Sequence, residues 1–424
     1  MINQASVKAV QDAQWTPHFI RPLYDSYCFA QIPGLIPGLL GGAEAGGMAE
    51  MLLGPLAGTY DKLILTFVDA FGWRFWQRYA ERYPFLRRIA EEGVATKLTS
   101  QFPSTTAAHS TTIHTGLPVG QSGVYEWFYY EPLVDEMIAP LLFSFAGDKD
   151  RNTLRPTRVP PADFFPRGTF YHGLRRQGIT PYIFQHEAYT PSPFGDAVMG
   201  GTEMRPYRDL PSALGGLTSA LLAERERSYY FFYYGEIDTV GHKHGPNSPQ
   251  FEAAVDDFFT LMESAFYGPT VGHLGKTLLL ITADHGLVET DPATTVYLNL
   301  TLPELTGLMQ TNAAGRPLVP GGSARDMFLH IEGERLAEAQ AMLREHLSGK
   351  ADVYPVSELI AQGFFGSGEP SAAFMGRVGN LVVLPYAGES VWWHESGRFS
   401  QDFYGHHGGL TRAEMETLLL GLRL

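Results

Sequence analysis

Three short apolar runs place the strongest constraint on how this chain can fold. They are KLILTFVD (residues 62–69), YYFFYYGEID (229–238) and KTLLLITAD (276–284). Each run is rich in β-branched or aromatic residues and does not alternate with polar ones, which is typical of strands buried on both faces of a parallel sheet. Each run also leads into an aspartate. Because ligands of open α/β sheets bind beyond the carboxyl ends of the strands, we expect these carboxylates to converge on one site.

Segments with helical patterning lie between these strands. Residues 72–93 carry charges at helical spacing, and residues 248–268 place apolar side chains on one side of a helix. Strands that alternate with helices predict an α/β fold, with a doubly wound and mostly parallel sheet that has helices on both faces.

The pattern changes in the second half of the chain. Residues 324–356 predict a strand, a helix and a strand, and none of the candidate site aspartates falls there. We therefore expect a smaller inserted α+β lobe over residues 302–374, after which GNLVVLP (379–385) returns to the core. The α/β core that carries the site then comprises residues 61–301 and 375–424, and residues 1–60 form an N-terminal arm.

Composition excludes several classes of protein. Hydrophobic residues make up 44% of the 424 and charged residues only 18%, which predicts a large core rather than disorder. The 31 basic and 45 acidic residues give a net charge of −14, which argues against a nucleic-acid polymer as partner. An acidic chain still accommodates an anionic substrate when bound cations set the local field. The single cysteine, Cys28, excludes an intrachain disulfide and a thiolate zinc cluster.

The N-terminal segment predicts neither export nor membrane insertion. Residues 1–15 lack a basic start followed by an apolar run, so they do not resemble a signal peptide. The apolar stretch at residues 29–58 is interrupted by prolines, glycines and two glutamates, whereas a spanning helix needs about 20 uninterrupted apolar residues. We expect a packed, irregular arm or a homodimer contact there, in a cytoplasmic protein without a membrane partner.

The stretch GEIDTVGHKHGP (residues 235–246) holds the first candidate metal ligands. Asp238 and His242 are four residues apart, so a turn or a short helix would bring both to one ion. A carboxylate with an imidazole is a borderline donor set that suits zinc. The alternative is a solvated loop with hydrogen-bonded histidines. We expect His244 to lie behind the ligands or at the surface.

A second pair of candidates follows the third apolar run. Asp284 and His285 are adjacent, and adjacent side chains of an extended segment point in opposite directions. Both reach one ion only where the backbone bends, and Gly286 permits a tight turn. The alternative is a capped loop.

The segment SQFPSTTAAHSTTIHTGLP (residues 100–118) offers a hydroxyl nucleophile. Its simplest interpretation is a helix cap. The other interpretation is a hydroxyl activated by a metal ion, because an unactivated hydroxyl is a poor nucleophile. Thr106 at a helix N-terminus would also direct backbone N–H groups at a phosphate. The chain has candidate metal ligands but no GxSxG around a serine, so metal activation is favoured over a Ser-His-Asp triad.

A pair of histidines near the end of the sequence completes the candidate motifs. In FYGHHGGLTRAEM (residues 403–415), His406 and His407 precede two glycines and a predicted capped helix. Without other information this segment is a polar loop. We expect ordinary polar loops at three further histidines, His330, His346 and His394.

The order of these motifs resembles the alkaline phosphatase superfamily, and within it the type I phosphodiesterase/nucleotide pyrophosphatase family. FVDAFGW, FPSTTAAHSTTIHTGLP, GEIDTVGHKHGP, ITADHGL and GHHGG follow one another in the order of that family. The resemblance runs from about Leu63 to the C-terminus. It implies an alkaline-phosphatase-like fold and a hydrolase of phosphoric esters. It also implies two zinc ions at the carboxyl ends of the sheet strands, with manganese as the other candidate metal.

The resemblance further implies a role for each candidate residue. One zinc would be held by Asp238, His242 and His407. The other would be held by Asp69, Asp284 and His285, beside the hydroxyl of Thr106. The family pattern selects Thr106 over Thr105 as the nucleophile and His407 over His406 as the ligand. Thr106 would attack phosphorus in line and form a covalent phospho-threonine intermediate that water then hydrolyses.

One position departs from the family pattern. In nucleotide pyrophosphatases, an asparagine beyond the threonine motif donates to a phosphate oxygen. Trp127 occupies that place here with Glu126 beside it, and neither is an amide donor. The surrounding aromatic residues predict either a surface that stacks on a base or covers an apolar ester group, or ordinary core. We take Glu126 and Trp127 as candidate substrate contacts.

A phosphomonoesterase on the same metal site is the main alternative activity. It would need a positive group for the extra phosphate charge, and no arginine stands beside Thr106 in the sequence. Neither CxPxR nor SxPxR occurs, which argues against a sulfatase. A phosphomutase and a non-catalytic zinc-binding relative are less favoured. The predicted partner is a small-molecule phosphoester.

Overall fold

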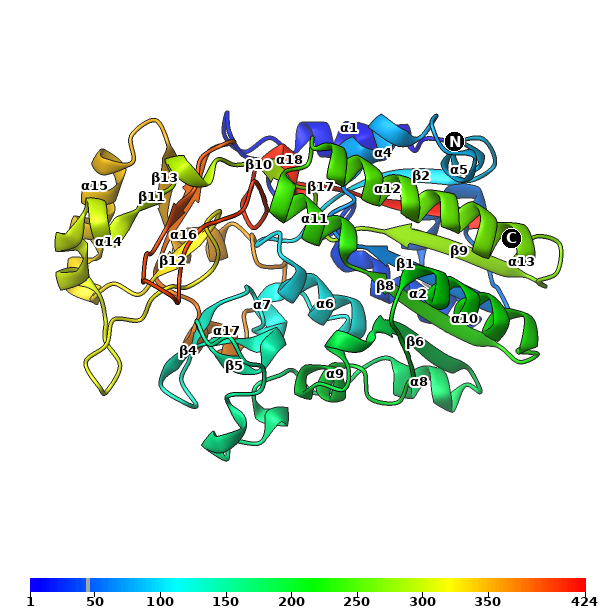
Figure 1. The fold of residues 1–424 in the computed structure, drawn as a ribbon, viewed down its shortest axis with the longest axis horizontal. Coiled ribbons are helices and arrows are strands. Elements are labelled where there is room, and N and C mark those ends of the chain that lie inside the picture. The colour runs from blue at the N-terminus through cyan, green and yellow to red at the C-terminus, as the bar shows by residue number, and fades with distance from the viewer. Residues whose placement is uncertain (43–45) are drawn as a thin grey trace.

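A seven-stranded sheet forms the centre of the computed structural model, which describes residues 1–42 and 46–424 (Figure 1). Its strands, in spatial order, are β2 (Val94–Thr99), β17 (Glu416–Arg423), β9 (Thr277–Thr282), β1 (Lys62–Val68), β8 (Ser228–Tyr234), β6 (Thr180–His186) and β7 (Glu203–Tyr207). All neighbouring pairs are parallel except those of β17, which is antiparallel to both β2 and β9. The predicted mostly parallel sheet is confirmed.

The three predicted apolar runs are β1, β8 and β9, which lie side by side in this sheet. Alternate residues of β1 belong to two different hydrophobic clusters. Leu63, Leu65 and Phe67 pack into one cluster, whereas Ile64 and Val68 pack into the other. Because side chains of a strand alternate between its faces, the two clusters cover opposite faces of the sheet. This is why the runs show no polar alternation.

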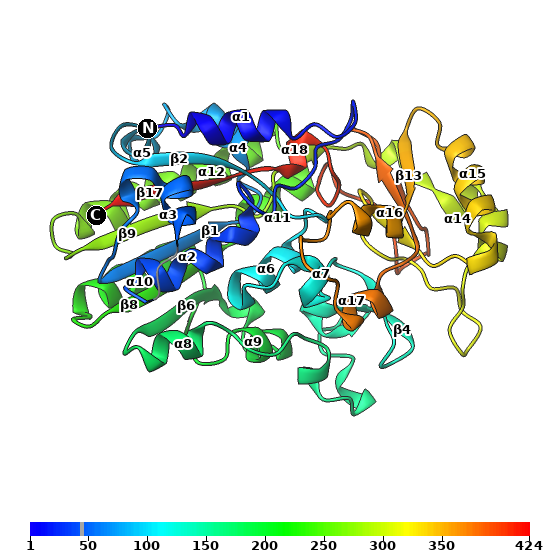
Figure 2. The same cartoon turned by 180° about the vertical axis from the view of Figure 1, so that it is seen from behind.

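Helices cover both faces, as Figures 1 and 2 show from opposite sides. One face is covered by α4 (Trp73–Tyr79), α5 (Pro84–Glu92), α10 (Leu210–Ala223), α11 (Glu236–His244), α12 (Pro249–Leu261), a π-helical turn (Met262–Tyr267) and α13 (Gly268–Thr270). The other is covered by α2 (Ile32–Leu39), α3 (Gly47–Leu53), α6 (Thr106–Thr115), α8 (Tyr171–Arg176) and α9 (Pro193–Val198). The same hydrophobic cluster continues beyond the end of the sheet, where it includes α7 (Val119–Ser122), α16 (Val356–Ala361) and α17 (Ala372–Arg377) (Figure 1). The helical pattern at residues 72–93 forms two helices, because Pro84 requires an extended residue before it and starts α5.

The N-terminal residues pack on this core. α1 (Gln4–Asp12) lies along β2, and the N–H of Asn3 donates to the carbonyl oxygen of Ala95 at 2.9 Å. Phe19, Phe29 and Ile36 are fully buried in the cluster on one face of the sheet. Among the residues that the structure describes, none of the helices combines the length and the apolar character needed to cross a membrane.

A smaller lobe lies beyond the end of the sheet where the site is found (Figure 1). Its antiparallel strands, in spatial order, are β12 (Met327–Leu329), β14 (Leu381–Pro385) and β13 (Ala351–Pro355). They pack with α14 (Leu298–Thr301) and α15 (Leu336–His346), so the predicted strand, helix and strand at residues 324–356 are confirmed. The prediction that residues 379–385 return to the core is wrong, because β14 pairs with both other strands of the small sheet. The proposed division into arm, core and lobe stays a prediction.

Short strand pairs carry the loops around the site. β3 (Tyr129–Glu131), β4 (Glu136–Ala139) and β5 (Ser144–Phe145) form a small antiparallel sheet after α7. β11 (Val296–Tyr297) pairs with β15 (Val391–Trp392). β10 (Val288–Glu289) pairs with β16 (Gly405–His406), which brings the segment before α18 (Arg412–Met415) next to the loop after β9.

Candidate metal centre

Two neighbouring strands of the sheet end beside buried carboxylates. Asp69 directly follows β1, and Asp284 lies two residues beyond β9, the strand paired with β1. The backbone N–H of Ala70 donates to Oδ1 of Asp284 at 3.1 Å, which ties the two turns together. Asp69, Asp284 and His285 are at most 1% exposed. The structure therefore places two of the three aspartates that follow the apolar runs side by side, and the third, Asp238, lines the same cavity as Asp69.

The turn after β9 needs glycine for space. A Cβ on Gly286 would lie 2.2 Å from the carbonyl oxygen of Ala413, and the N–H of Gly286 donates to the carbonyl of Glu414 at 2.8 Å. The backbone bends here as the sequence predicts. As a result, the adjacent side chains meet, with Nε2 of His285 lying 3.1 Å from Oδ2 of Asp284.

The candidate nucleophile is the first residue of helix α6. Thr105 before it is extended, so the first N–H groups of α6 have no carbonyl partner within the helix. Thr106 Oγ1 lies 3.3 Å from Oδ2 of Asp69 and 3.4 Å from Nε2 of His285. The structure thus places Thr106 at a helix N-terminus, beside the ligands that the family resemblance assigns to one ion.

A buried histidine fixes the start of this helix. Nδ1 of His109 lies 2.8 Å from the carbonyl oxygen of Thr105, and its Nε2 accepts the N–H of Gln101 at 3.0 Å. Ser100, 2.8 Å from the same Nε2, donates its hydroxyl to the carbonyl of Asp284 at 2.7 Å. Burial lowers the pKa of His109 to about 4, so the ring is neutral at physiological pH. His109 therefore links α6 to the loop after β9.

The remaining candidate ligands come from two distant segments. Asp238 lies in the first turn of α11, and Nε2 of His242, one turn later, is 3.3 Å from its Oδ1. Nε2 of His407, the residue after β16, is 3.8 Å from the same oxygen. Asp238 belongs to a helix rather than to the end of the predicted strand run, because β8 ends at Tyr234 and Gly235 begins the helix.

Three histidines present the same ring nitrogen to the site. In each of them, Nδ1 lies within hydrogen-bond distance of a backbone carbonyl and Nε2 lies near a carboxylate. The carbonyl contacts are His242 with Gly405 (2.8 Å), His407 with Ser104 (2.9 Å) and His285 with Gly286 (3.0 Å). Metal-ligating histidines are oriented in this way, because a hydrogen bond from one ring nitrogen leaves the other free to bind an ion.

Two groups of three side chains have the spacing to hold metal ions. The donor atoms of Asp69, Asp284 and His285 lie within 4.8 Å of one another, as do those of Asp238, His285 and His407. The first group is the set implied for one zinc. The second contains His285 where the resemblance implies His242, although His242 remains next to Asp238. Of the other histidines, His406 is buried behind His407, and His244 is exposed.

The charges of these side chains fit bound cations. Burial and repulsion from Asp284 and Asp238 raise the pKa of Asp69 well above its usual range. Burial and the neighbouring His285 and His242 lower the pKa of His407. Within the described part of the chain, Oδ1 of Asp238 and Oδ2 of Asp284 are buried without a hydrogen-bond partner. Buried carboxylate oxygens that lack donors are stabilised when cations bind them.

Two cavities meet at Thr106. The first, of about 350 Å³, is lined by Asp238 and His407 and has an aromatic wall. That wall consists of Trp127, Phe128, Trp392, Phe399 and Phe403. The second, of about 220 Å³, follows Asp69 and is lined by Tyr189, Tyr233 and Arg151 among others. Thr106, Trp127 and Asp238 line both cavities.

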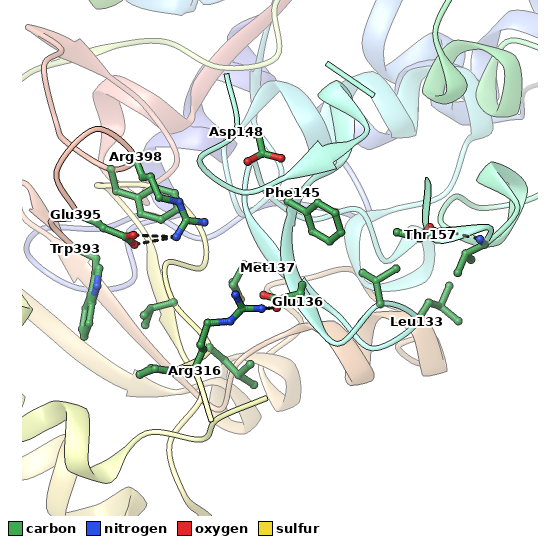
Figure 3. Close-up of a pocket in the computed structure, with 16 residues that line it drawn as sticks. Leu133, Glu136, Met137, Phe145, Asp148, Thr157, Arg316, Trp393, Glu395 and Arg398 are labelled. Atoms are coloured by element: carbon green, nitrogen blue, oxygen red, sulfur yellow. Dashed lines mark hydrogen bonds and ion pairs between the residues drawn. The ribbon is translucent and has the colours of Figure 1, made fainter. Parts of the chain in front are cut away.

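A larger cleft of about 750 Å³ lies apart from the candidate ligands (Figure 3). It is bounded by the β3–β5 sheet and the small lobe, and its charged side chains are mostly paired. Glu136 pairs with Arg316, and Glu395 pairs with Arg398 at 2.9 Å. Arg398 and Phe399 also line the aromatic cavity, so the cleft adjoins that cavity.

A family model described as type I phosphodiesterase/nucleotide pyrophosphatase matches residues 63–410. The chain belongs to that family. The resemblance seen in the motif order is thereby confirmed, as is membership of a metal-dependent family of phosphoric ester hydrolases.

One related sequence and two solved structures are similar to the chain. The human ectonucleotide pyrophosphatase/phosphodiesterase family member 7 is 25% identical over 251 residues, which are 55% of this chain and 49% of that protein. The chain thus matches about half the length of this relative. A mouse ectonucleotide pyrophosphatase/phosphodiesterase 5, in an inactive threonine-to-alanine variant in complex with AMP, superposes with a TM-score of 0.61 at 16% identity over 85% of this chain and 87% of its own. Phosphonoacetate hydrolase from Sinorhizobium meliloti, in complex with phosphonoacetate, superposes with a TM-score of 0.58 at 17% identity over 84% of this chain and 89% of its own. These structures confirm the alkaline-phosphatase-like α/β fold.

The departure from the type I phosphodiesterase/nucleotide pyrophosphatase pattern has a clear structural form. Glu126 is fully buried, and its Oε2 accepts the N–H of Trp127, while its Oε1 has no partner among the described residues. Burial raises the pKa of Glu126 to about 7. Trp127 is 36% exposed and separates the two cavities. Both predicted substrate contacts therefore line the site. Glu126 is a buried acid in one cavity, and Trp127 lies between the two cavities.

Several residues of this family member's site carried no signal in the sequence. The hydroxyl of Tyr233 donates to Oδ2 of Asp69 at 2.5 Å, but Tyr233 is one of several aromatic residues in β8. Asp326 is fully buried, and a Cβ on Gly408 would lie 2.6 Å from its Oδ1. Repulsion from Glu126 adds to burial in raising the pKa of Asp326. Arg151 reaches the second cavity from a loop without a motif.

Proposed function

We propose that this protein is a phosphodiesterase that uses two zinc ions and Thr106 as its nucleophile. The observation that carries the proposal is that two cavities meet at Thr106. A phosphodiester has an ester group on each side of phosphorus. A phosphorus atom near Thr106 Oγ1 would therefore have one cavity for each ester group, whereas a monoester needs only one.

The residues present suit two ions. Asp69, Asp284 and His285 would hold one, and Asp238, His242 and His407 would hold the other, with His285 between the two sets. Mixed imidazole and carboxylate donors favour zinc over magnesium or calcium. When bound, the ions would supply positive charge for the reacting oxygens and lower the pKa of a coordinated hydroxyl or water.

Thr106 Oγ1 would be the attacking atom. Its hydroxyl would lose its proton as the bond from Oγ1 to phosphorus forms, because a bound ion beside it would lower the pKa of the hydroxyl. The bond to the leaving ester oxygen breaks, and that oxygen takes up the proton and departs as an alcohol. Water then attacks the phosphorylated Thr106, the bond between phosphorus and Oγ1 breaks, and Thr106 regains a proton as the monoester leaves.

The N-terminus of α6 would bind the phosphoryl group during both steps. Its unpaired N–H groups and the positive end of its dipole suit an anion next to Thr106. Glu126 and Trp127 cannot supply an amide donor here, so backbone groups would carry this part of the binding. The two cavities and the net charge of −14 favour a small-molecule substrate over a nucleic-acid polymer.

The decisive variant is Thr106→Ala, with Thr115→Ala as its matched control. Thr115 lies on the same helix and donates its hydroxyl to the carbonyl of Thr111 at 2.7 Å, away from the ligands. We expect the zinc-loaded Thr106→Ala protein to keep its fold and its zinc while kcat falls by roughly 10³-fold or more. The substrates are bis(4-nitrophenyl) phosphate and 4-nitrophenyl phosphate.

Two results would contradict this proposal. An unchanged rate in Thr106→Ala would remove Thr106 as the nucleophile. A higher kcat/KM of the wild-type enzyme for the monoester than for the diester would favour a phosphomonoesterase instead. Zinc and manganese, each added after removal of metal with a chelator, would identify the metal that supports turnover.

A further inference from the structure

We propose that the cavity on the Asp69 side binds an oxyanion carried by one ester group of the substrate, and that Arg151 recognises it. This inference rests on the proposed phosphodiesterase function and adds a substrate class to it. The expected substrate is a phosphodiester with a carboxylate or a second phosphate on one of its two ester groups.

The guanidinium of Arg151 is held in place from behind. Its Nη1 donates to the carbonyl of Ala188 at 2.7 Å, and its Nη2 donates to the carbonyl of Leu141 at 3.3 Å. The group also lies over the ring of Tyr189, 5.9 Å from its centroid. A guanidinium has five N–H donors, so three remain for a ligand after these two contacts.

Arg151 is the one lysine or arginine among the described residues that line this cavity. Within the described chain, both hydrogen bonds of its guanidinium go to backbone carbonyl groups rather than to a carboxylate. The carboxylates in the same cavity, Asp69 and Asp238, would be occupied by the metal ions. A guanidinium that is positioned by carbonyl groups but has no counter-ion is suited to bind a carboxylate or phosphate with two parallel hydrogen bonds.

Two tyrosines connect Arg151 to the reacting centre. Tyr233 donates its hydroxyl to Asp69 at 2.5 Å, and its ring lies 6.0 Å from that of Tyr189. Tyr189 in turn contacts Arg151. Burial, Asp69 and Asp238 raise the pKa of Tyr189, and Arg151 offsets only part of this rise, which agrees with a position of Tyr189 between them. The oxyanion would therefore sit apart from the reacting phosphorus, beyond the two rings.

Among the described residues that line the opposite cavity, none supplies an equivalent free cation. Arg398 lines it, but this side chain already pairs with Glu395 at 2.9 Å and donates to the carbonyl of Ala146 at 2.8 Å. Five aromatic side chains form much of the remaining wall, and Ser323, Ser400 and Gln401 are among the uncharged polar residues that complete it. The two cavities thus differ in charge, which predicts a substrate with one anionic arm and one apolar arm.

The test uses Arg151→Met, the conservative Arg151→Lys and the control Arg155→Met. Arg155 is exposed, lies four residues away and lines none of the described cavities. The substrates are three 4-nitrophenyl phosphodiesters whose second ester group is propyl, 2-carboxyethyl or 2-phosphoethyl. We expect Arg151→Met to raise KM about 10–100-fold for the anionic esters, the size of a lost charge-assisted hydrogen bond. KM for the propyl ester and kcat should stay within about twofold of wild type, the range of a removed exposed charge.

Each outcome bears on the proposal. A KM for the anionic esters that is lower in Arg151→Lys than in Arg151→Met supports a charge contact. The anionic ester whose KM rises more in Arg151→Met shows whether carboxylate or phosphate is preferred. An equal rise in KM for the propyl ester, or for 4-nitrophenyl phosphate, would overturn the proposal. Arg151 would then act on the fold or on the transferred phosphoryl group. The same change in Arg155→Met would also overturn it.

A binding measurement separates this inference from the proposed reaction. Calorimetric titration of the zinc-loaded protein with 3-phosphonopropionate and with propylphosphonate compares two ligands that differ in a carboxylate. We expect tighter binding of 3-phosphonopropionate by the wild type and loss of that preference in Arg151→Met. Equal affinities in the wild type would refute the oxyanion subsite, whereas absence of turnover with all three esters would refute the phosphodiesterase activity alone.

Discussion

The two halves of the candidate metal centre are built in different ways. The side chains of Asp69, Asp284 and His285, which we term the buried pole, are between 0% and 2% exposed. Those of Asp238, His242 and His407, the outer pole, are between 10% and 15% exposed. The buried pole follows two neighbouring strands and is fixed by their pairing. The outer pole joins a helix to a loop more than 160 residues away, as the contact of His242 with Gly405 shows.

This difference indicates that the sheet preforms the buried pole. Strands β1 and β9 place the buried pole wherever they pair, because its residues follow directly from their ends. The outer pole depends on contacts among α11, β16 and the small lobe. We expect the buried pole to bind its ion more tightly, and the outer pole to be the half that adapts to the substrate.

The largest expected effect comes from exchanging one histidine of each pole for alanine. His285 belongs to both groups of potential ligands, so His285→Ala should remove both ions. Turnover should then fall by roughly 10²–10³-fold or more, as when a preorganised electrostatic group is lost. His242→Ala should leave the ion of the buried pole in place. For each variant, the zinc content per chain after dialysis measures ion retention and kcat measures turnover. Loss of both ions from His242→Ala would contradict the difference between the poles.

A second effect concerns a buried ion pair behind the outer pole. Nε and Nη2 of Arg325 donate to Glu414 at 2.9 and 3.0 Å, and both side chains are 0% exposed. Glu414 also accepts the N–H of Gly409, two residues after His407. Arg325→Met would leave Glu414 charged and unpaired, and should lower the free energy of unfolding by about 3–5 kcal/mol.

Urea denaturation of Arg325→Met measures this change, with the double variant Arg325→Met/Glu414→Gln as its control. The double variant should recover part of the lost stability, because it no longer buries an unpaired carboxylate. Zinc affinity of the outer pole should fall more than that of the buried pole. A single variant as stable as the wild type would show that the lobe does not support the outer pole.

The smallest predicted effect is a pH dependence at Glu126, which lines the cavity of the outer pole. Burial raises its pKa from 4.5 to about 7 in the folded chain. The contribution of the protonated Glu126 carboxyl to the free energy of unfolding is therefore fully present below pH 4.5. It is lost as the pH rises through 7. Relative to the metal-free wild type, Glu126→Gln should gain stability with rising pH, up to about 3 kcal/mol. Unfolding free energies of the two metal-free proteins between pH 5 and 8 test this, and a constant difference would refute it.

Much of the sheet could be predicted because its strands are buried on both faces. β1, β8 and β9 are continuous apolar runs of strand length, and such runs are typical of a parallel sheet that helices cover on both sides. β14 is also a continuous apolar run, yet it belongs to the small sheet. An apolar run predicts that a strand is buried, but it does not predict to which sheet the strand belongs.

The candidate ligands were identifiable because each lies in a motif, whereas their surroundings were not. Arg151 and Asp326 reach the site from loops with no motif. Only the folded chain brings Arg151 into the cavity that Thr106 also lines, and Asp326 close to Glu126. The sequence also showed no arginine beside Thr106, although the fold places Arg151 in the same cavity. Glu126 stands between aromatic residues in the sequence, whereas its full burial and its raised pKa arise only in the folded chain.

We expect Thr106 to form a covalent bond to phosphorus between the two poles. Rapid acid quenching of the zinc-loaded enzyme during turnover of bis(4-nitrophenyl) phosphate, followed by peptide mass analysis, tests it directly. We predict a 4-nitrophenyl phosphoryl group on Thr106 in the peptide that contains the start of α6, and none in Thr106→Ala. Turnover with no modification of Thr106 at any quench time, or the same modification on another residue, would contradict the claim.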